Sequence, residues 1–379
     1  MSLYERLGVP RVVNAVGPAT RFGGVPLSAP VLAAMAEATT LAVDVEELQR
    51  TAGAHLARLL GVPGAYVTPG ASAALLLGTA AVLTGTDPGL VDALPEVRGP
   101  RDTVVVQAAH RDPYDHAVTA TGARLVSVGY PASTRRDELA RALDECTAAV
   151  LYRPGRPGEH VGLHETAALA HAVGARVIVD GALHVPPADR LRAYVDQGAD
   201  LVAVSGGKVF RGPQASGLLL GDPDLLAAVA LHHQDMDVRD ATWSRPGERD
   251  PRGAPRQGIG RSLKIGREQL LGLVVAVETY LEHGPDPVGR DELEVVMTAL
   301  TGAGVAARWH HDTALDVTNL EVDVTGVDAN AVLARLADRA PAIFVEEGAV
   351  WRGALLLNPM ALLPGDGALL ADALLTELT

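Results

Sequence analysis

Only two lysines occur in this chain of 379 residues, Lys208 and Lys264, and arginine supplies all the other fixed positive charge. Lys208 follows the stretch LVAVSGG, in which a continuous apolar run ends in two glycines that give the backbone freedom. A lysine amine, with an ordinary pKa of about 10.4, is a poor nucleophile at neutral pH unless burial or positive charge lowers that pKa. In a dry cleft, Lys208 could form a Schiff base. Arg211, just downstream, would suit a phosphate or a carboxylate.

The stretch TPGASAA predicts a helix that begins just after Gly70. The first N–H groups of that helix, with Ser72 beside them and no bulky side chains, would make an anion site suited to a phosphate. On its own this signal is weak, because small residues at a helix start are often only a tight turn.

Two further side chains stand at predicted strand ends. His110, in QAAHRDPYDHA, could stack on a flat cofactor or could be a partly buried histidine bonded to a backbone carbonyl. For His116, farther along, the second interpretation is preferred. Asp180 ends the apolar run RVIVD, and a charge buried there needs a cationic partner. A protonated nitrogen of a bound aromatic ring would serve, although Asp180 could instead cap the next helix.

One cofactor accounts for all four features. Pyridoxal 5'-phosphate needs a lysine for its aldehyde, an acid opposite its pyridine nitrogen, a helix N-terminus for its phosphate and a flat group over its ring. The acid keeps the ring nitrogen protonated, so that the ring can accept electrons when a bond at the substrate α-carbon breaks. Lys264 has no such acid before it, and we expect it to have no chemical role.

These side chains need a scaffold that brings strand ends together. From residue 101 onward, continuous apolar runs alternate with amphipathic stretches, which is typical of strands buried on both faces with helices between them. The pattern predicts an α/β fold with a mostly parallel sheet, whose carboxyl edge binds ligands. Later residues favour a small α+β domain. We expect an N-terminal arm over 1–45, a large cofactor-binding domain over 46–262 and a small domain over 263–379. The polar segment 232–256 is too long for a plain connector and is expected to cross the surface or cover a site.

Composition narrows the classes of partner. A formal charge of -14 gives no basic surface for a nucleic-acid backbone, so small molecules are favoured as partners. Cys146 is the only cysteine, which excludes an internal disulfide, and the N-terminus lacks the pattern of a signal peptide. The apolar runs are too short to span a bilayer. We expect a cytoplasmic protein.

With these residues in hand, the chain resembles the fold-type-I pyridoxal-phosphate enzymes, which have an aspartate aminotransferase-like large domain. More narrowly, it resembles the group containing selenocysteine synthase (L-seryl-tRNA selenium transferase) and D-glucosaminate-6-phosphate ammonia-lyase. The most specific motif is SGGK followed by RGPQ, and the likeness extends through TPGASAALLLGTAAVLTG, HRDPYDHA, VIVDGA and GIGRSLKIGREQ.

The resemblance implies a role for each candidate residue. Lys208 would form the Schiff base and Asp180 would pair with the pyridine nitrogen. The family is dimeric or larger with shared active sites, so Arg261 in GIGR would reach the phosphate bound by the neighbouring subunit. Arg21 would face the substrate together with Arg211, although a salt bridge that anchors a helix explains Arg21 equally well. The remaining cofactor contacts would come from Gly70, Ala71, Ser72, His110 and Ser205.

Departures from the family pattern affect the substrate side. DGAL follows the Asp180 strand where Asp-Ala-Ala is expected, GPAT replaces a Gly-Thr-Leu-Thr type of arm, and Gln257 stands where histidine is frequent. We expect a lyase that removes the α-proton of a small amino acid or amino sugar acid and expels a β-leaving group. An aminotransferase or racemase is the alternative. The acidity argues against selenium transfer on seryl-tRNA, and the presence of both lysine and acid argues against a non-catalytic relative.

Overall fold

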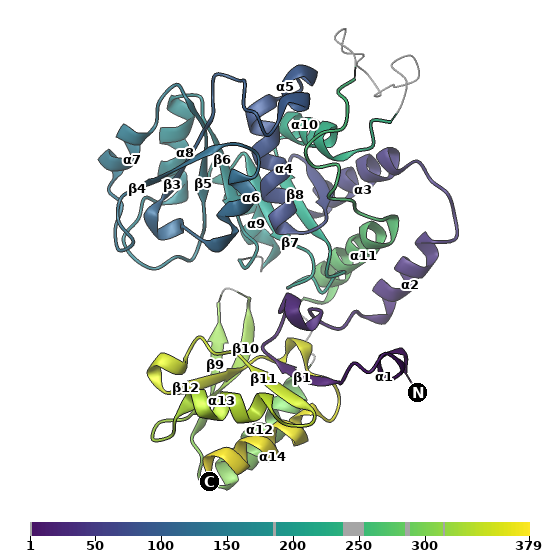
Figure 1. Cartoon of the computed structure of the whole chain (residues 1–379), viewed down its shortest axis with the longest axis vertical. Coiled ribbons are helices and arrows are strands. Elements are labelled where there is room, and N and C mark those ends of the chain that lie inside the picture. Colours follow the sequence, from purple (N-terminus) through teal and green to yellow (C-terminus); the bar gives the residue numbers. More distant parts are fainter. Residues whose placement is uncertain (1, 185–186, 238–253, 285–288, 314) are drawn as a thin grey trace. The chain divides into compact units, whose positions relative to one another are not determined.

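The computed structural model divides into two compact units (Figure 1). The large unit comprises Ser28–Leu281, and the small unit comprises Met1–Leu27 together with Glu282–Thr379. Most of helix α11 (Arg267–His283), placed by the sequence in the small domain, therefore lies in the large unit. Much of the segment 232–256 falls outside the described residues, so its role stays a prediction. The structure describes residues 2–184, 187–237, 254–284, 289–313 and 315–379.

The large unit is built on one seven-stranded sheet with the order β2-β8-β7-β6-β5-β3-β4. The strands from β7 through β4 in this order run parallel, whereas β8 is antiparallel to both β7 and β2. All strands except β8 therefore end at the same edge of the sheet. This confirms the predicted α/β class with a mostly parallel sheet. The strands are β2 (Ala65–Thr68), β3 (Thr103–Gln107), β4 (Arg124–Val128), β5 (Thr147–Tyr152), β6 (Arg176–Asp180), β7 (Leu201–Ser205) and β8 (Gly217–Gly221).

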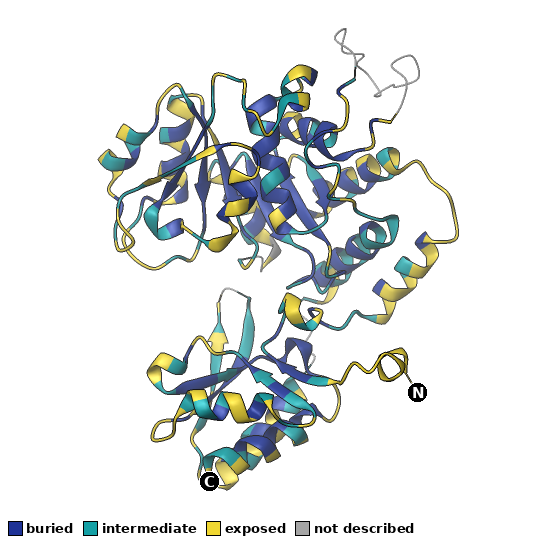
Figure 2. Ribbon diagram, viewed as in Figure 1, coloured by how far each residue is buried: buried dark blue, intermediate teal, exposed yellow. Residues whose placement is uncertain are grey.

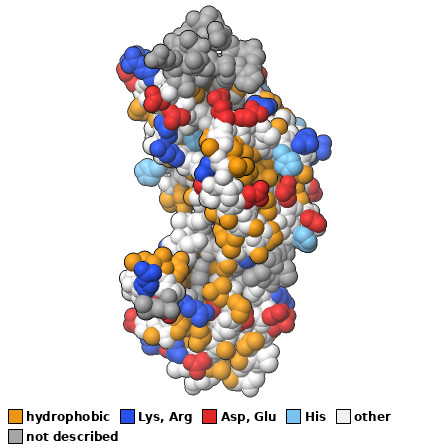
Figure 3. All heavy atoms as spheres, turned by 90° about the vertical axis from the view of Figure 1, so that its right-hand side faces the viewer, with side chains coloured by type: hydrophobic (Ala, Val, Ile, Leu, Met, Phe, Trp, Pro, Cys, Tyr) orange, Lys and Arg blue, Asp and Glu red, His pale blue; other side chains and the backbone are white. Residues whose placement is uncertain are grey.

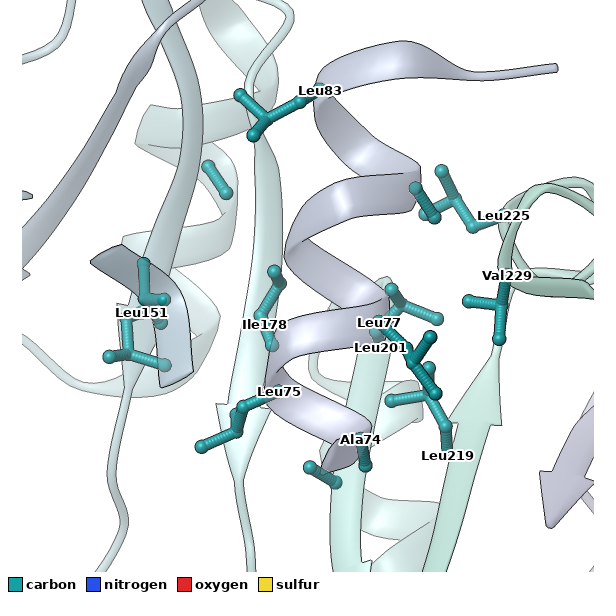
Figure 4. Packing of buried hydrophobic residues seen from close by; sticks show 14 of the residues in the cluster. Ala74, Leu75, Leu77, Leu83, Leu151, Ile178, Leu201, Leu219, Leu225 and Val229 are labelled. Carbon is teal, nitrogen blue, oxygen red and sulfur yellow. The ribbon is translucent and has the colours of Figure 1, made fainter. Parts of the chain in front are cut away.

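Helix α4 forms the centre of the large hydrophobic core. It is mostly apolar and mostly buried, as suits a helix enclosed by other elements (Figure 2). Its Leu75 and Leu77 lie against Ile178, Leu201 and Leu219 of the sheet (Figure 4). No helix in the described part of the chain is long and apolar enough to cross a bilayer. The remaining helices of this unit are α2 (Ala29–Ala38), α3 (Val45–Leu60), α5 (Pro88–Ala93), α6 (His116–Thr119), α7 (Arg136–Ala142), α8 (Leu163–Ala172), α9 (Ala188–Asp196) and α10 (Pro223–His233), with α4 at Ala71–Thr84.

The small unit combines two separate sheets with helices. Strand β1 (Val12–Ala15), within the predicted arm, pairs in parallel with β11 (Ala342–Val345). A three-stranded antiparallel sheet has the order β12-β10-β9. Leu293, Leu320, Leu355 and Leu370 are fully buried between the helices and this sheet. The other elements are β9 (Ala307–Asp312), β10 (Val317–Asp323), β12 (Ala354–Leu357), α1 (Leu3–Arg6), α12 (Arg290–Gly302), α13 (Ala329–Ala337) and α14 (Asp366–Leu378).

Candidate active site

Lys208 lies on a tight turn at the carboxyl end of β7. The strand ends at Ser205, and the backbone N–H of Gly206 donates to the carbonyl oxygen of Ser216 at 2.9 Å. A Cβ on Gly207 would lie 2.9 Å from the Cα of Gln214, so no other residue fits this turn without movement. The two glycines therefore let the chain turn within a crowded space and present Lys208 at the sheet edge.

Arg211 closes the same turn in a strained conformation. Its φ of 54° is in the left-handed region, which is costly for a residue with a side chain. Its backbone N–H donates to the carbonyl oxygen of Lys208 at 3.0 Å. Such strain is common at functional sites, and here it accompanies the turn that carries the candidate nucleophile.

The Lys208 side chain is half-buried, in contrast to the exposed Lys264. Burial lowers the pKa of the Lys208 amine, and the negative charges of Asp180 and Asp112 offset this only in part. Within the described residues, no hydrogen bond or ion pair holds this amine. A larger fraction of the amine is therefore neutral, and available as a nucleophile or a base, than for an exposed lysine.

Asp180, at the end of β6, has a cationic partner within the protein. Its Oδ2 accepts a hydrogen bond from Nε of Arg153 at 2.8 Å, and its Oδ1 accepts from the backbone N–H of Ala182 at 3.2 Å. Asp180 does not cap helix α9, because the N-cap of that helix is Pro187. The prediction that this carboxylate needs a cation is thus met by an arginine.

Arg153 was missed in the sequence. It is only 3% exposed, and its Nη1 also donates to Oδ1 of Asp115 at 2.7 Å. Burial alone would lower the pKa of Arg153, but the hydrogen bonds and charges of Asp180 and Asp115 raise it overall, so the guanidinium stays charged. The signal was present, since Arg153 directly follows an apolar strand, as Asp180 ends one.

The start of helix α4 stands at the same sheet edge. Gly70 is the N-cap of this helix and has a φ of 121°. Because glycine has no side chain, no capping hydrogen bond is made to the N–H groups of the first turn. A Cβ built on Gly70 would meet nothing within 4 Å, so there is open space beside it. Gly217 of β8 pairs with both Thr68 and Ser205, which brings the strand before Gly70 close to the strand before Lys208. Ala71 is buried and Ser72 is exposed.

His110 is completely buried, which the sequence left open. Its ring centre lies 4.6 Å from that of Tyr152 and 4.8 Å from that of His160, and both contacts are edge-on. Burial lowers the pKa of His110 to about 3, and the charges of His160, Arg153 and Arg156 act in the same direction. His110 is therefore neutral at physiological pH, and its stacking on a cofactor stays a prediction.

The two remaining arginines have partners of their own. Arg261, in the large unit, forms an ion pair with Asp235, with 2.6 Å between Nη2 and Oδ2. Arg21 belongs to the small unit, where its guanidinium lies 4.5 Å from the ring centre of Phe22 and 5.3 Å from that of Phe344. Arg21 thus has cation–π contacts instead of the salt bridge considered for it.

A separate pocket of about 390 Å³ lies between α3, β2 and α10, away from this edge. Its lining is mainly apolar and includes Tyr66, Leu226 and Ala230. Because none of the predicted site residues lines it, the chemistry is assigned to the sheet edge and not to this pocket.

Solved structures share the fold of this chain. Aspartate aminotransferase from Thermus thermophilus matches with a TM-score of 0.53 and 16% identity over 99% of this chain and 94% of that chain, which supports the fold alone. The structure of D-glucosaminate-6-phosphate ammonia-lyase matches with a TM-score of 0.82 and 28% identity, covering 99% of this chain and 97% of that one.

Sequence comparison agrees with these matches. No family model matches the chain. It is 30% identical to D-glucosaminate-6-phosphate ammonia lyase of Salmonella typhimurium, over 98% of this chain and 97% of that protein. It is 32% identical to 5'-C-glycyluridine monooxygenase-decarboxylase of a Streptomyces species, over 96% of this chain and 88% of that protein. It is 31% identical to L-seryl-tRNA(Sec) selenium transferase of Moorella thermoacetica, over 58% of this chain and 50% of that protein. The chain belongs to the fold-type-I pyridoxal-phosphate enzymes, in the group that contains the ammonia lyase.

Proposed function

We propose that this enzyme binds pyridoxal 5'-phosphate covalently through Lys208 and eliminates a β-leaving group from a small amino acid or amino sugar acid. The observation that carries the proposal is the amine of Lys208, which has no hydrogen bond or ion pair among the described residues and whose pKa is lowered by burial, near the carboxylate of Asp180, which is 11% exposed. A lysine in this setting suits Schiff-base chemistry and proton transfer.

The residues at the sheet edge fit the groups of this cofactor. The start of α4 offers N–H donors and open space beside Gly70 for a phosphate. A carboxylate has about four lone-pair positions, and Asp180 uses two of them for Arg153 and Ala182, so it can still accept from a ring nitrogen. The further contacts are proposed for Ala71, Ser72, His110, Ser205 and Arg261 on the cofactor, and for Arg21 and Arg211 on the substrate.

Different residues of the chain are assigned different roles in the reaction. When bound, pyridoxal phosphate supplies an electron sink for the bond that breaks at the α-carbon. The neutral Nζ atom of Lys208 would take up the α-proton, and burial keeps a larger fraction of that amine neutral because it lowers its pKa. Arg153 holds Asp180 in one orientation by its 2.8 Å hydrogen bond. The carboxylate is thereby positioned before ligand arrives, which reduces the cost of ordering it.

The substrate class is inferred from relatives. The likeness to D-glucosaminate-6-phosphate ammonia lyase extends over nearly the whole chain and supports elimination from an amino sugar acid. The equally strong likeness to a monooxygenase-decarboxylase supports a second candidate, an oxygen-dependent decarboxylation. Transamination and racemisation begin with the same proton removal and stay as alternatives.

Replacing Lys208 tests the proposal most directly. Lys208→Ala is expected to abolish both turnover and the visible absorption of covalently bound cofactor. The matched control is Lys264→Ala, which removes the exposed lysine and should leave both unchanged. Thermal unfolding of the cofactor-free forms of the two variants should differ little, because the Lys208 amine has no hydrogen bond or ion pair to lose among the described residues. Retained turnover in Lys208→Ala would exclude the mechanism.

A panel of amino acids and amino sugar acids separates the reactions. Elimination releases ammonia and a 2-oxo acid without an amino acceptor, whereas transamination requires the acceptor. Consumption of molecular oxygen with release of carbon dioxide would instead support the decarboxylation. Solvent deuterium in unchanged substrate of inverted configuration would indicate racemisation.

We further propose a homodimer or larger homo-oligomer in the cytoplasm. In the large unit, Leu32, Leu41, Val43 and Val45 are 41–68% exposed, and Figure 3 shows apolar side chains gathered on the face where Figure 1 draws α2 and α3. Exposed apolar groups that gather on one face are typical of a subunit interface. Light scattering on the eluted protein tests this, and a single species of 39.3 kDa would contradict it.

A further inference from the structure

The end of helix α10 carries a chain of hydrogen bonds between three buried side chains. The amide of Gln234 donates to the hydroxyl oxygen of Tyr66 at 2.8 Å, and that oxygen lies 2.9 Å from Nδ1 of His233. Nε2 of His233 lies 2.5 Å from the carbonyl oxygen of Leu263. The three side chains are at most 7% exposed, so solvent hardly competes for these bonds. The chain of bonds connects strand β2, helix α10 and the segment 257–263.

These hydrogen bonds run in one direction. A backbone carbonyl can only accept, so the ring of His233 carries a proton on Nε2 and donates it to Leu263. Burial lowers the pKa of His233, and together with the charge of Arg261 it outweighs the opposing effect of that carbonyl. The ring is therefore neutral at physiological pH, and its Nδ1 accepts from the hydroxyl of Tyr66. Because one arrangement of protons satisfies every bond, the orientation of His233 is fixed.

The 257–263 segment lies directly on the end of α10. A Cβ on Gly258 would collide with the Cα of His232, and a Cβ on Gly260 would collide with the side chain of Leu77. Neither glycine has a positive φ, so the close approach and not the local backbone conformation requires them. A bond made at this contact therefore holds the backbone of the segment.

Arg261 lies on this segment, two residues before Leu263. Its backbone N–H donates to the carbonyl oxygen of Gly258 at 3.0 Å, and its Nη2 donates to Oδ2 of Asp235 at 2.6 Å. Oδ1 of Asp235 accepts from the amide of Gln257 at 3.2 Å. Among the described residues no other side chain bonds the guanidinium of Arg261. One side of the guanidinium is thus held, and its Nε and Nη1 are left for a ligand.

We propose that His233 is a positioning residue for Arg261. Its bond to Leu263 holds the segment in the place from which the guanidinium of Arg261 contacts the phosphate of the cofactor. Through Tyr66 it also joins the segment to the phosphate site of the same chain, since β2 ends two residues before Gly70. This inference rests on the proposed function, in which Arg261 contacts the cofactor.

A double-mutant cycle on cofactor affinity tests the positioning role. Cofactor-free protein is titrated with pyridoxal 5'-phosphate, and the Kd is read from the visible absorption. His233→Phe keeps a flat ring and removes both hydrogen bonds of the histidine, so it should weaken binding roughly fivefold. In an Arg261→Ala background no guanidinium is left to position, and the same substitution should change the Kd by less than about twofold.

Two further variants separate positioning from a general loss of packing. His232→Phe alters the neighbouring buried ring, which bonds Thr84 and not the segment, and it should leave the Kd unchanged. His233→Gln keeps an N–H donor for Leu263, so it should retain most of the affinity that His233→Phe loses. Circular dichroism of the cofactor-free variants shows that each is folded, and His233→Gln carries the test if His233→Phe is not.

Each result decides the assignment. Equal weakening by His233→Phe with and without Arg261, or weakening of the same size in His232→Phe, would mean that His233 only supports the fold. Unchanged affinity in His233→Phe would also overturn the positioning role. An Arg261→Ala variant that binds the cofactor as tightly as the unsubstituted protein would remove the group through which His233 acts. Failure of the proposed function is seen separately, because the unsubstituted protein would then show no visible cofactor band.

Discussion

A cluster of arginines and carboxylates in the large unit and another in the small unit have opposite arrangements. In the large unit, Arg153 stands between Asp115 and Asp180, and the three side chains are 3%, 9% and 11% exposed. In the small unit, Glu321 of β10 is 8% exposed and bonds Arg308 and Arg352, which are 71% and 30% exposed.

The difference in exposure changes what the clusters do. Water reaches the two arginines around Glu321, so removing one leaves charges that remain solvated. Around Arg153 water does not solvate the side chains in this way, so a carboxylate that loses its cation there stays buried without a counter-charge. The Glu321 cluster is a surface feature of a sheet. The Arg153 cluster fixes the geometry of a site, and its charges persist because they neutralise one another.

Breaking the buried cluster should have the largest effect on stability. Arg153→Met leaves Asp180 without its cation, whereas Asp115 keeps its ion pair with Arg111, so we expect the free energy of unfolding to fall by about 3–5 kcal/mol. Urea denaturation of the cofactor-free protein, followed by circular dichroism, measures this. A loss as small as that of an exposed ion pair would show that the two clusters do not differ as their burial suggests.

Low pH should reduce the stability of the large unit because of its buried histidines. Burial lowers the pKa of His232 to about 4, as it lowers that of His110 to about 3. The unfolded chain binds protons below about pH 6.5 while these folded-state rings do not, so stability falls as pH drops from about 6.5 towards 4. His232→Asn should reduce this fall by on the order of 2–3 kcal/mol.

The pH dependence is measured as the free energy of unfolding at several pH values. Nε2 of His232 lies 2.9 Å from Oγ1 of Thr84, so Thr84→Val serves as a control that removes this hydrogen bond and keeps the ring. If His232→Asn leaves the slope between pH 7 and pH 4 unchanged, the ring does not resist protonation in the folded protein.

The smallest effect is expected in the exposed cluster. Arg308→Met should change the free energy of unfolding by at most about 1 kcal/mol, and less at high salt, because Arg308 is largely solvated and Glu321 keeps Arg352. In a Trp243→Phe background, the remaining tryptophans, Trp309 and Trp351, both belong to the small unit. Their fluorescence therefore follows the unfolding of that unit, and a loss comparable to that of Arg153→Met would remove the distinction.

Local sequence determined the framework of the site. Continuous apolar runs that end in Asp180 or in the two glycines before Lys208 mark buried parallel strands, and such strands must deliver their ends to one edge. The glycine-bounded start of α4 follows from the same reasoning. These features depend on residues next to one another in the chain, so they can be recognised without a structure.

Tertiary structure alone decided which groups meet. Arg153 and Asp180 stand 27 positions apart and meet because β5 and β6 are neighbours in the sheet. The edge-on enclosure of His110 depends on a loop pinned by Gln107, and the contacts of Arg21 depend on Phe344 at the far end of the chain. Pairings of this kind arise from strand order and loop closure, which a local pattern does not contain, and they set the burial that gives each charge its pKa.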